Sequence, residues 1–321
     1  MQSSMIADLK DSYGITCNQV TPVSGGWLNH KWKISTDKGE LLIKQFSSKR
    51  YKRDKLKLVE SALQRQIILG KYGVPCPFIH MCAGYAIRIL DDEIAYMVMD
   101  FYPGKVESPD TITIMQMRSL GNACGLMHKA FSALPARFVE GYPLSSGKTI
   151  DALWANFHIR MRECSSDAPV EYRKAVLAQE SILKQLTNGF FDKLPKGIGH
   201  EDFAADNILF HADGISAIVD FDRNHYSYIR HDIGRAILSF ALKENKLDIK
   251  KIYAFMEGYS QHSELTMPDM ADALRLSWCM EIPWWIQPEF FETNEEKVVR
   301  FKDEMLWLTE HWFELDSLLC H

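Results

Sequence analysis

A run of polar residues near position 200 has the types and spacing that chemistry on a charged group requires. His200, Asp202 and Asn207 form the pattern H-x-D-x-x-x-x-N, and Asp220-Phe221-Asp222 follows thirteen residues beyond Asn207, after an apolar stretch. A carboxylate such as that of Asp202 can orient a hydroxyl group and accept its proton. Asp220 and Asn207 can offer carboxylate and amide oxygens, the hard donors that Mg²⁺ prefers. The pattern therefore predicts metal-assisted transfer of a phosphoryl group to a hydroxyl.

Four aspartates crowd this part of the chain. They lie within twenty-one residues, at Asp202, Asp206, Asp220 and Asp222. Like charges held this closely repel one another unless a cation lies among them. We therefore predict Asp222 as a further metal ligand, with a role as a loop brace left open. For His200 we favour bracing of the loop through hydrogen bonds over proton chemistry.

Residues that suit a nucleotide come earlier, in the order that phosphoryl transfer needs. Ser24-Gly25-Gly26 can form a loop against phosphates, and Lys44 interrupts an apolar strand, where its charge requires partners. We expect Lys44 to hold the α- and β-phosphates and Glu60, in the following helix, to pair with Lys44. The backbone at Met99, Asp100 and Phe101 is predicted to meet the adenine ring.

The elements that must position these residues change in type along the chain. Apolar spacing and turn signals predict strands over 20–23, 27–34, 41–46, 85–90 and 94–99, and one helix over 52–72. After a connector at 100–104 the pattern is mainly helical, with a helix start at Pro109-Asp110-Thr111 and one hairpin over 208–219. Strands followed by helices predict an α+β fold with segregated elements.

The motifs together resemble the aminoglycoside phosphotransferase/choline kinase superfamily of small-molecule kinases, over essentially the whole chain. The resemblance implies a protein-kinase-like fold with a small β-sheet N-lobe that carries one helix and a larger, mainly helical C-lobe. It also implies that Asp202 is the catalytic base, that Asn207 and Asp220 bind Mg²⁺, and that Lys44 and Glu60 form the phosphate-anchoring pair. ATP is the expected phosphoryl donor, with GTP left open.

Two features depart from the pattern of this superfamily, and one further residue matches it. Glu201 stands where many members have glycine, and the nucleotide loop holds only Gly25-Gly26. Asp232, in His231-Asp232-Ile233-Gly234, matches an aspartate that these proteins often carry after the segment Asp220-Phe221-Asp222. We call Asp220-Phe221-Asp222 the metal segment, after its predicted role. We expect Asp232 to be structural.

Charge divides along the chain as the predicted lobes do. Residues 1–104 hold 14 Lys and Arg against 10 Asp and Glu, whereas residues 105–321 hold 23 against 32. We predict a nucleotide-binding N-lobe over 1–102 and a C-lobe over 103–321 with the catalytic loop, metal site and acceptor pocket. The acidic balance argues against nucleic acid as a partner, because a phosphate backbone requires a basic surface.

The last 44 residues hold five of the eight tryptophans, interleaved with glutamates. Most of these rings are expected to pack the core. Trp278, Glu281, Trp284 and Trp285 are the candidates for an acceptor pocket, because aromatic faces and carboxylates bind ammonium groups well. We therefore expect an amino-bearing acceptor: an amino alcohol, an amino acid or an aminoglycoside-like sugar.

Other functions and locations are weighed against this one. A protein kinase acting on a polypeptide is the first alternative, although only residues 223–231 separate Asp222 from Asp232, which leaves little room for a long activation loop. A nucleotide-binding pseudokinase is the second. No apolar run is long enough for a membrane span, the start lacks a secretory signal and the seven cysteines are unpatterned, so we expect a cytoplasmic protein without a membrane partner. The sequence leaves the oligomeric state open.

Overall fold

The computed structural model describes residues 1–23, 29–90, 94–135, 138 and 149–320, which form two compact units. The first unit contains residues 1–105 together with 208–211 and 215–224, and the second contains 106–207, 212–214 and 225–321. The predicted lobe boundary after Tyr102 stays a prediction.

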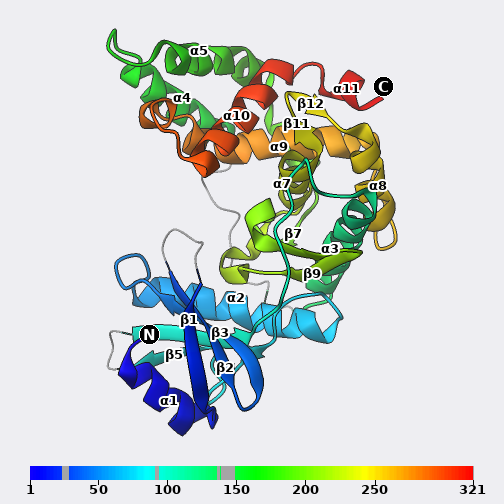
Figure 1. Ribbon diagram of the computed structural model, residues 1–321. Helices are drawn as coiled ribbons and strands as arrows, with labels where there is room; N and C mark the ends of the chain where they lie inside the picture. Colours follow the sequence, from blue (N-terminus) through cyan, green and yellow to red (C-terminus); the bar gives the residue numbers. More distant parts are fainter. Residues whose placement is uncertain (24–28, 91–93, 136–137, 139–148, 321) are drawn as a thin grey trace. The chain divides into compact units, whose positions relative to one another are not determined.

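The first unit is built on a six-stranded antiparallel sheet (Figure 1). Its strands are β1 (Cys17–Pro22), β2 (His30–Thr36), β3 (Gly39–Phe46), β4 (Ile79–His80), β5 (Ile87–Leu90) and β6 (Ile94–Asp100). The order is β1-β2-β3-β6-β4, and β5 also pairs with β6. Helix α2 (Arg53–Lys71) follows β3, so the helix predicted over 52–72 is confirmed. Helix α1 (Ser3–Tyr13) precedes the sheet and was not predicted.

Strand β6 divides two cores between the faces of this sheet. Ala95, Met97 and Met99 are buried with Val59 and Leu63 of α2. The intervening Tyr96 and Val98 are buried in a second cluster with Met5 and Leu9 of α1. Successive side chains of a strand point to opposite faces, so this alternation follows from the strand itself. Lys44 has the parity of Leu42 and Phe46, which places it on the α2 face.

The hairpin β8 (Ile208–His211) and β9 (Gly214–Ile218) confirms the one predicted over 208–219. Backbone contacts tie it to early parts of the chain. Lys105 and Phe210 exchange backbone hydrogen bonds, and Ile218 donates its N–H to the carbonyl of Pro75 at 2.7 Å. Residues 215–224, with the metal-segment aspartates, therefore belong to the same compact unit as Lys44.

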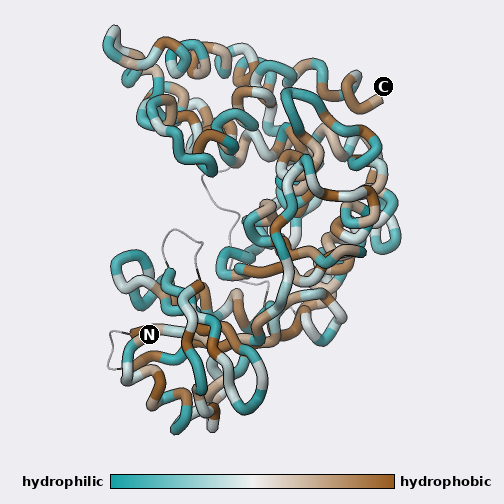
Figure 2. Tube along the Cα trace, in the orientation of Figure 1, coloured by the Kyte–Doolittle hydropathy of each residue, from teal (hydrophilic) through white to brown (hydrophobic). Residues whose placement is uncertain are grey.

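The second unit is mainly helical, and short strands support the segments between its helices. Its helices are α3 (Ile114–Ser132), α4 (Ile150–Glu163), α5 (Val170–Gln185), α6 (Asn188–Asp192), α7 (Arg230–Ala241), α8 (Ile249–Tyr259), α9 (Met267–Trp285), α10 (Glu296–His311) and α11 (Leu315–Cys320). The strand pairs are β7 (Lys196–Gly199) with β10 (His225–Tyr228), and β11 (Leu242–Lys243) with β12 (Lys246–Leu247). Brown and teal residues alternate along the helices in Figure 2, as expected when one face of each is buried. Within the described part of the chain, no helix is both long and apolar enough to cross a membrane.

Helix α3 begins later than its predicted start at Pro109-Asp110-Thr111. Thr113 caps it, because its hydroxyl accepts the N–H of Gln116 while the Gln116 side chain accepts the N–H of Thr113. This reciprocal pair satisfies two N–H groups of the first turn and defines where the helix begins. Helix α3 then packs closely on α8, since a Cβ atom at Gly121 would lie 1.9 Å from the carbonyl oxygen of Phe255. Only glycine fits at that crossing.

Candidate active site

The predicted catalytic loop follows β7 in the second unit, and a buried carboxylate fixes its backbone. Asp232, in the first turn of α7, accepts the N–H of His200 at 2.7 Å and the N–H of Glu201 at 2.9 Å. Glu201 has a φ of 64°, in the left-handed region that glycine adopts most readily. Two hydrogen bonds from consecutive N–H groups to one carboxylate therefore hold a turn that a glutamate would otherwise resist.

Asp232 is kept ionised although it is fully buried. Burial alone would raise the pKa of this carboxyl, but a hydrogen bond from His128 and the nearby His200 and His231 outweigh that effect and lower the pKa. His128 Nε2 lies 3.1 Å from Asp232, and His128 Nδ1 lies 3.0 Å from the hydroxyl of Tyr259. Helices α3, α7 and α8 thus join in one buried polar network that ends at the loop backbone.

Asp202 and Asn207 are linked within the loop. The Asn207 side-chain nitrogen donates to the carbonyl of Asp202 at 2.8 Å, and the Asn207 N–H donates to the carbonyl of Ala204 at 2.9 Å. The first bond fixes which end of the Asn207 amide is nitrogen. Its other end is an oxygen, which is the donor type that a magnesium ion requires.

Asp206 connects the loop to helix α10. Its carboxylate forms ion pairs with Lys297 at 2.6 Å and with Arg300 at 3.2 Å. Burial opposes ionisation, but these two cations lower the pKa of Asp206 overall. The Lys297 and Arg300 side chains keep exposed fractions of 41% and 32%.

In the first unit, Lys44 brings the two metal-segment aspartates together. Its ammonium donates to Asp220 at 2.7 Å and to Asp222 at 2.6 Å, although 176 residues separate Lys44 from Asp220 in the sequence. Burial would lower the pKa of Lys44, but the two carboxylates more than offset that effect and raise it. Lys44 is therefore a buried cation paired with two anions.

The same two carboxylates fit a metal ion. Asp220 and Asp222 already converge on one cation, and carboxylate oxygens are the ligands that Mg²⁺ prefers. Across the described residues, no three His, Cys, Asp or Glu side chains form a ready metal cluster. In nucleotide sites a magnesium ion usually binds few protein ligands and takes the others from phosphates and water.

Glu60 does not lie with Lys44. Its carboxylate accepts the N–H groups of Ala86 at 2.9 Å and Ile87 at 2.8 Å, and also the side-chain amide of Gln64. These bonds hold the start of β5 against α2. Glu60 was predicted from its place in the helix after Lys44. That position alone does not indicate whether the carboxylate pairs with a lysine or accepts backbone N–H groups.

The predicted nucleotide contacts divide into described and undescribed parts. Ser24, Gly25 and Gly26 lie outside the described residues. Met99 is buried in β6, and the N–H groups of Asp100 and Phe101 donate to the carbonyls of Phe78 and Glu40. Adenine would therefore need carbonyl groups of this connector, or other N–H groups, unless those two bonds break.

The tail residues proposed for an acceptor pocket have three different environments. Trp278 is fully buried and donates to Thr309 at 2.8 Å, so it packs the core. Trp284 is 67% exposed. Trp285 stacks on Phe301 with ring centres 4.5 Å apart and donates to Glu281 at 3.1 Å.

Glu281 is the acidic centre of a second buried network. It pairs with His231 at 2.9 Å and with Arg235 at 3.1 Å, and Arg235 also pairs with Glu304 at 2.7 Å. The charge of Arg235 and the hydrogen bonds from His231 and Trp285 hold the pKa of Glu281 below its usual range against the effect of burial. Arg235 was not predicted. The available signal was an arginine within α7, in which every residue from His231 to Ala241 is buried.

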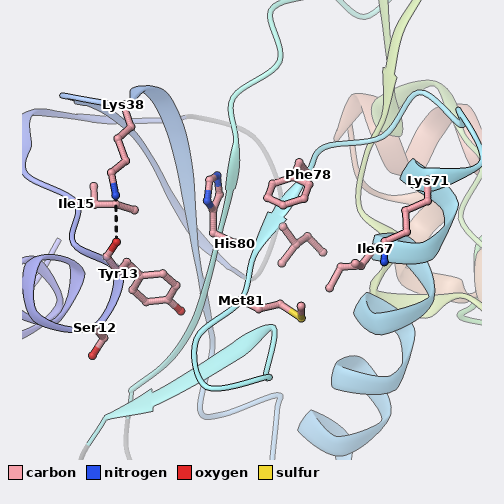
Figure 3. Close-up of a pocket in the computed structure, with 10 residues that line it drawn as sticks. Ser12, Tyr13, Ile15, Lys38, Ile67, Lys71, Phe78, His80 and Met81 are labelled. Carbon is pink, nitrogen blue, oxygen red and sulfur yellow. Dashed lines mark hydrogen bonds between the residues drawn. The ribbon is translucent and has the colours of Figure 1, made fainter.

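A cavity of about 520 Å³ lies in the first unit (Figure 3). Phe78, His80 and Met81 line it from one strand region, and Lys38 donates to the carbonyl of Tyr13 at its edge. None of the predicted phosphoryl-transfer residues lines this cavity.

Comparison with known proteins identifies the family of the chain. Residues 19–265 match the phosphotransferase enzyme family, which is more than three quarters of the chain. The chain belongs to this family. It is therefore a small-molecule kinase that phosphorylates a hydroxyl group, and the family resemblance drawn from the motifs is confirmed.

Individual relatives of this phosphotransferase are distant. A homoserine kinase from Allorhizobium ampelinum is 23% identical over 282 residues, which cover 83% of this chain and 81% of the relative. Spectinomycin phosphotransferase in complex with ADP and spectinomycin has a TM-score of 0.68 at 15% identity, with 99% of each chain covered. A microcompartment-associated aminopropanol kinase has a TM-score of 0.68 at 16% identity and the same coverage. These structures confirm the predicted α+β, kinase-like fold.

Proposed function

We propose that this phosphotransferase moves the γ-phosphoryl group of ATP to the hydroxyl of a small hydroxy amino acid, with Mg²⁺ bound. The single observation that supports binding of the nucleotide and metal is the pair of salt bridges from Lys44 to Asp220 and Asp222. A buried lysine on a sheet beside two carboxylates matches the arrangement in which kinases hold phosphates and metal.

Each residue has a defined part in this proposal. Asp202 orients the acceptor hydroxyl and takes its proton as the new oxygen–phosphorus bond forms. The bond between the γ-phosphorus and the β-phosphate oxygen breaks, and ADP keeps that oxygen. Lys44 anchors the α- and β-phosphates, while Asn207, Asp220 and Asp222 hold the metal. Bound Mg²⁺ supplies positive charge to the phosphoryl oxygens.

The acceptor class rests on charges beside the catalytic loop. Glu281 and Glu304 already pair with Arg235, so they are poor candidates for an ammonium group. Lys297 and Arg300 are also paired, with Asp206, but their side chains keep exposed fractions of 41% and 32%, against 11% for Glu281 and 5% for Glu304, so they are the better candidates to meet a charged group, here a carboxylate. An acceptor with a hydroxyl, an amine and a carboxylate combines this feature with the amino-bearing acceptor expected from the sequence, and homoserine kinases are among the relatives.

A panel of acceptors tests the proposal. Homoserine, serine, threonine, 1-amino-2-propanol, choline, spectinomycin and glucose are compared by ADP release with ATP and with GTP. Homoserine or a close hydroxy amino acid should give the highest kcat/KM, and Lys297→Met should raise the KM of amino acids more than that of amino alcohols. Activity confined to neutral sugars would refute the amino-bearing acceptor.

The catalytic base is tested separately. Asp202→Ala should lower kcat by about 10²- to 10⁴-fold, the usual contribution of a positioned base, with Mg·ATP binding largely retained in calorimetry. Asp213→Ala, in an exposed turn, is the control. Turnover of Asp202→Ala at the parent rate would show that another group accepts the proton.

A further inference from the structure

Helix α2 carries a buried arginine that none of the roles above uses. Arg65 is 1% exposed, and its guanidinium bonds to one residue in two places. Nε donates to the side-chain oxygen of Asn224 at 2.6 Å, and Nη2 donates to the carbonyl of Asn224 at 2.7 Å. A guanidinium offers donors in a rigid fork, so this two-point contact fixes both the position and the orientation of Asn224.

Asn224 lies two residues beyond the metal segment and closes the turn that contains it. The Asn224 residue is 2% exposed. Its side-chain nitrogen donates to the carbonyl of Phe221 at 2.7 Å and to the carbonyl of Ala62, on α2, at 2.9 Å. Its backbone N–H also donates to Phe221 at 3.2 Å. The Asn224 side chain therefore joins helix α2 to the residue between the two aspartates.

This connection acts on a backbone that needs support. Asp220 has a φ of 66°, a left-handed conformation that glycine adopts freely and that still costs some free energy in aspartate, although less than in most other residues. Such a conformation persists only where the surrounding structure holds it. Phe221, which follows it, is fully buried, and its carbonyl accepts hydrogen bonds from both the side chain and the backbone N–H of Asn224.

We propose that Arg65 is a positioning residue for the metal segment and acts through Asn224. Arg65 orients Asn224, Asn224 holds the Phe221 carbonyl, and the turn so fixed sets where the Asp220 and Asp222 carboxylates point. The role in metal binding rests on the proposed function, whereas the mechanical link from α2 to the turn does not.

A double-mutant cycle tests the link. Arg65→Met and Asn224→Ala should each raise the Mg²⁺ concentration for half-maximal ADP release by about 10- to 100-fold, the usual effect of losing a group that supports a metal ligand. Because both act through one connection, the double variant should be no worse than the poorer single variant. Arg65→Lys keeps the charge without the fork, and it should also raise the Mg²⁺ requirement.

Two measurements do not depend on turnover. Hydrogen exchange should speed up in the peptide that covers 219–225, and the rise in Tm caused by Mg·ADP should shrink. Arg88→Met is the matched control, because Arg88 forms an ion pair with Asp8 in the same unit and contacts neither Asn224 nor the metal segment among its described partners. That variant should lower Tm without changing the Mg²⁺ requirement.

The outcomes separate this proposal from the proposed function. If the losses of Arg65→Met and Asn224→Ala multiply in the double variant, or if Arg65→Lys and Arg65→Met lower only Tm, Arg65 does not act through Asn224 on the metal segment. Absence of phosphoryl transfer in the parent protein would refute the proposed function instead. In that case unchanged exchange at 219–225 in both Arg65 variants would still refute the link, and faster exchange would support it.

Discussion

Two short segments, one in each unit, contain a residue with a positive φ and are held by opposite kinds of hydrogen-bonding group. Glu201 in the catalytic loop and Asp220 in the metal segment both have a φ near 65°, a conformation that costs roughly 1–2 kcal/mol for most residues with a Cβ atom and less for aspartate. The loop is held by an anion, Asp232, which accepts its N–H groups. The metal segment is held by donors, because Asn224, oriented by the Arg65 guanidinium, donates to the Phe221 carbonyl.

The difference shows how each support leaves the neighbouring chemistry free. Donors that bind the backbone carbonyl of Phe221 do not compete for the carboxylates of Asp220 and Asp222, which remain able to bind cations. In the loop, an acceptor on the N–H groups leaves the carbonyl of Asp202 to bind Asn207. Each segment is therefore fastened through the backbone groups that its function does not need.

The largest effect that would test this comparison is expected at Asp220. Asp220→Asn removes the charge but keeps a side chain that tolerates the left-handed conformation. Magnesium-dependent binding of ATP should be lost, because one carboxylate is then missing from the metal site. Calorimetry of Mg·ATP measures it, and an unchanged binding isotherm would contradict the metal assignment. Asp222→Asn, measured in parallel, distinguishes a second ligand from a loop brace.

An intermediate effect is expected at Asp232. Asp232→Asn weakens the acceptor for two N–H groups, and hydrogen bonds to a charged group contribute about 1.5–3 kcal/mol each. We expect kcat to fall by about 10- to 100-fold, since 1.4 kcal/mol corresponds to a factor of ten, with Mg·ATP affinity unchanged.

Asp248 provides the control for that variant. It also accepts two N–H groups, those of Lys250 and Lys251, at the start of α8. Asp248→Asn should destabilise the second unit without lowering kcat. Equal losses of kcat in the two variants would mean that Asp232 supports the unit in general and not the loop.

The smallest effect is expected at the ion pair between Asp8 and Arg88, which lies outside both segments. It should change the stability of the protein and not its activity. A hydrogen bond from Arg88, with further ones from Tyr96 and Ser12, outweighs burial and lowers the pKa of Asp8 to about 2. A lowered pKa means that the stabilisation is present above the unfolded-state value of 3.8 and is lost as the pH falls through about 2. Asp8→Asn should therefore lower the free energy of unfolding by about 2 kcal/mol at pH 7. Denaturant melts at several pH values measure this, and a difference that stays constant from pH 7 to pH 2 would contradict it.

The sequence was sufficient for features that depend on neighbours along the chain. Strand alternation and the helix over 52–72 each follow from local spacing, and the structure has them. A lysine inside an apolar strand had to find anions, and Lys44 does.

Features that depend on distant partners were not predicted. Arg65 and Asn224 are 159 residues apart, and nothing in either local sequence indicates the other. The same limit explains Glu60, whose partners are two N–H groups of a later strand. The tail tryptophans could not be assigned for a related reason, since one ring type serves in the core at Trp278 and on the surface at Trp284.

The alternation along the central strands has a consequence for how this chain can vary. Lys44 shares its parity with Leu42 and Phe46, so a deletion or insertion of one residue early in β3 would turn the lysine to the α1 face and exchange the β3 side chains between the two cores. A protein with such a shift in strand register would misfold, and its loss of activity would follow from that. Variation in these strands is thus restricted to substitutions, and length changes belong in the turns between them.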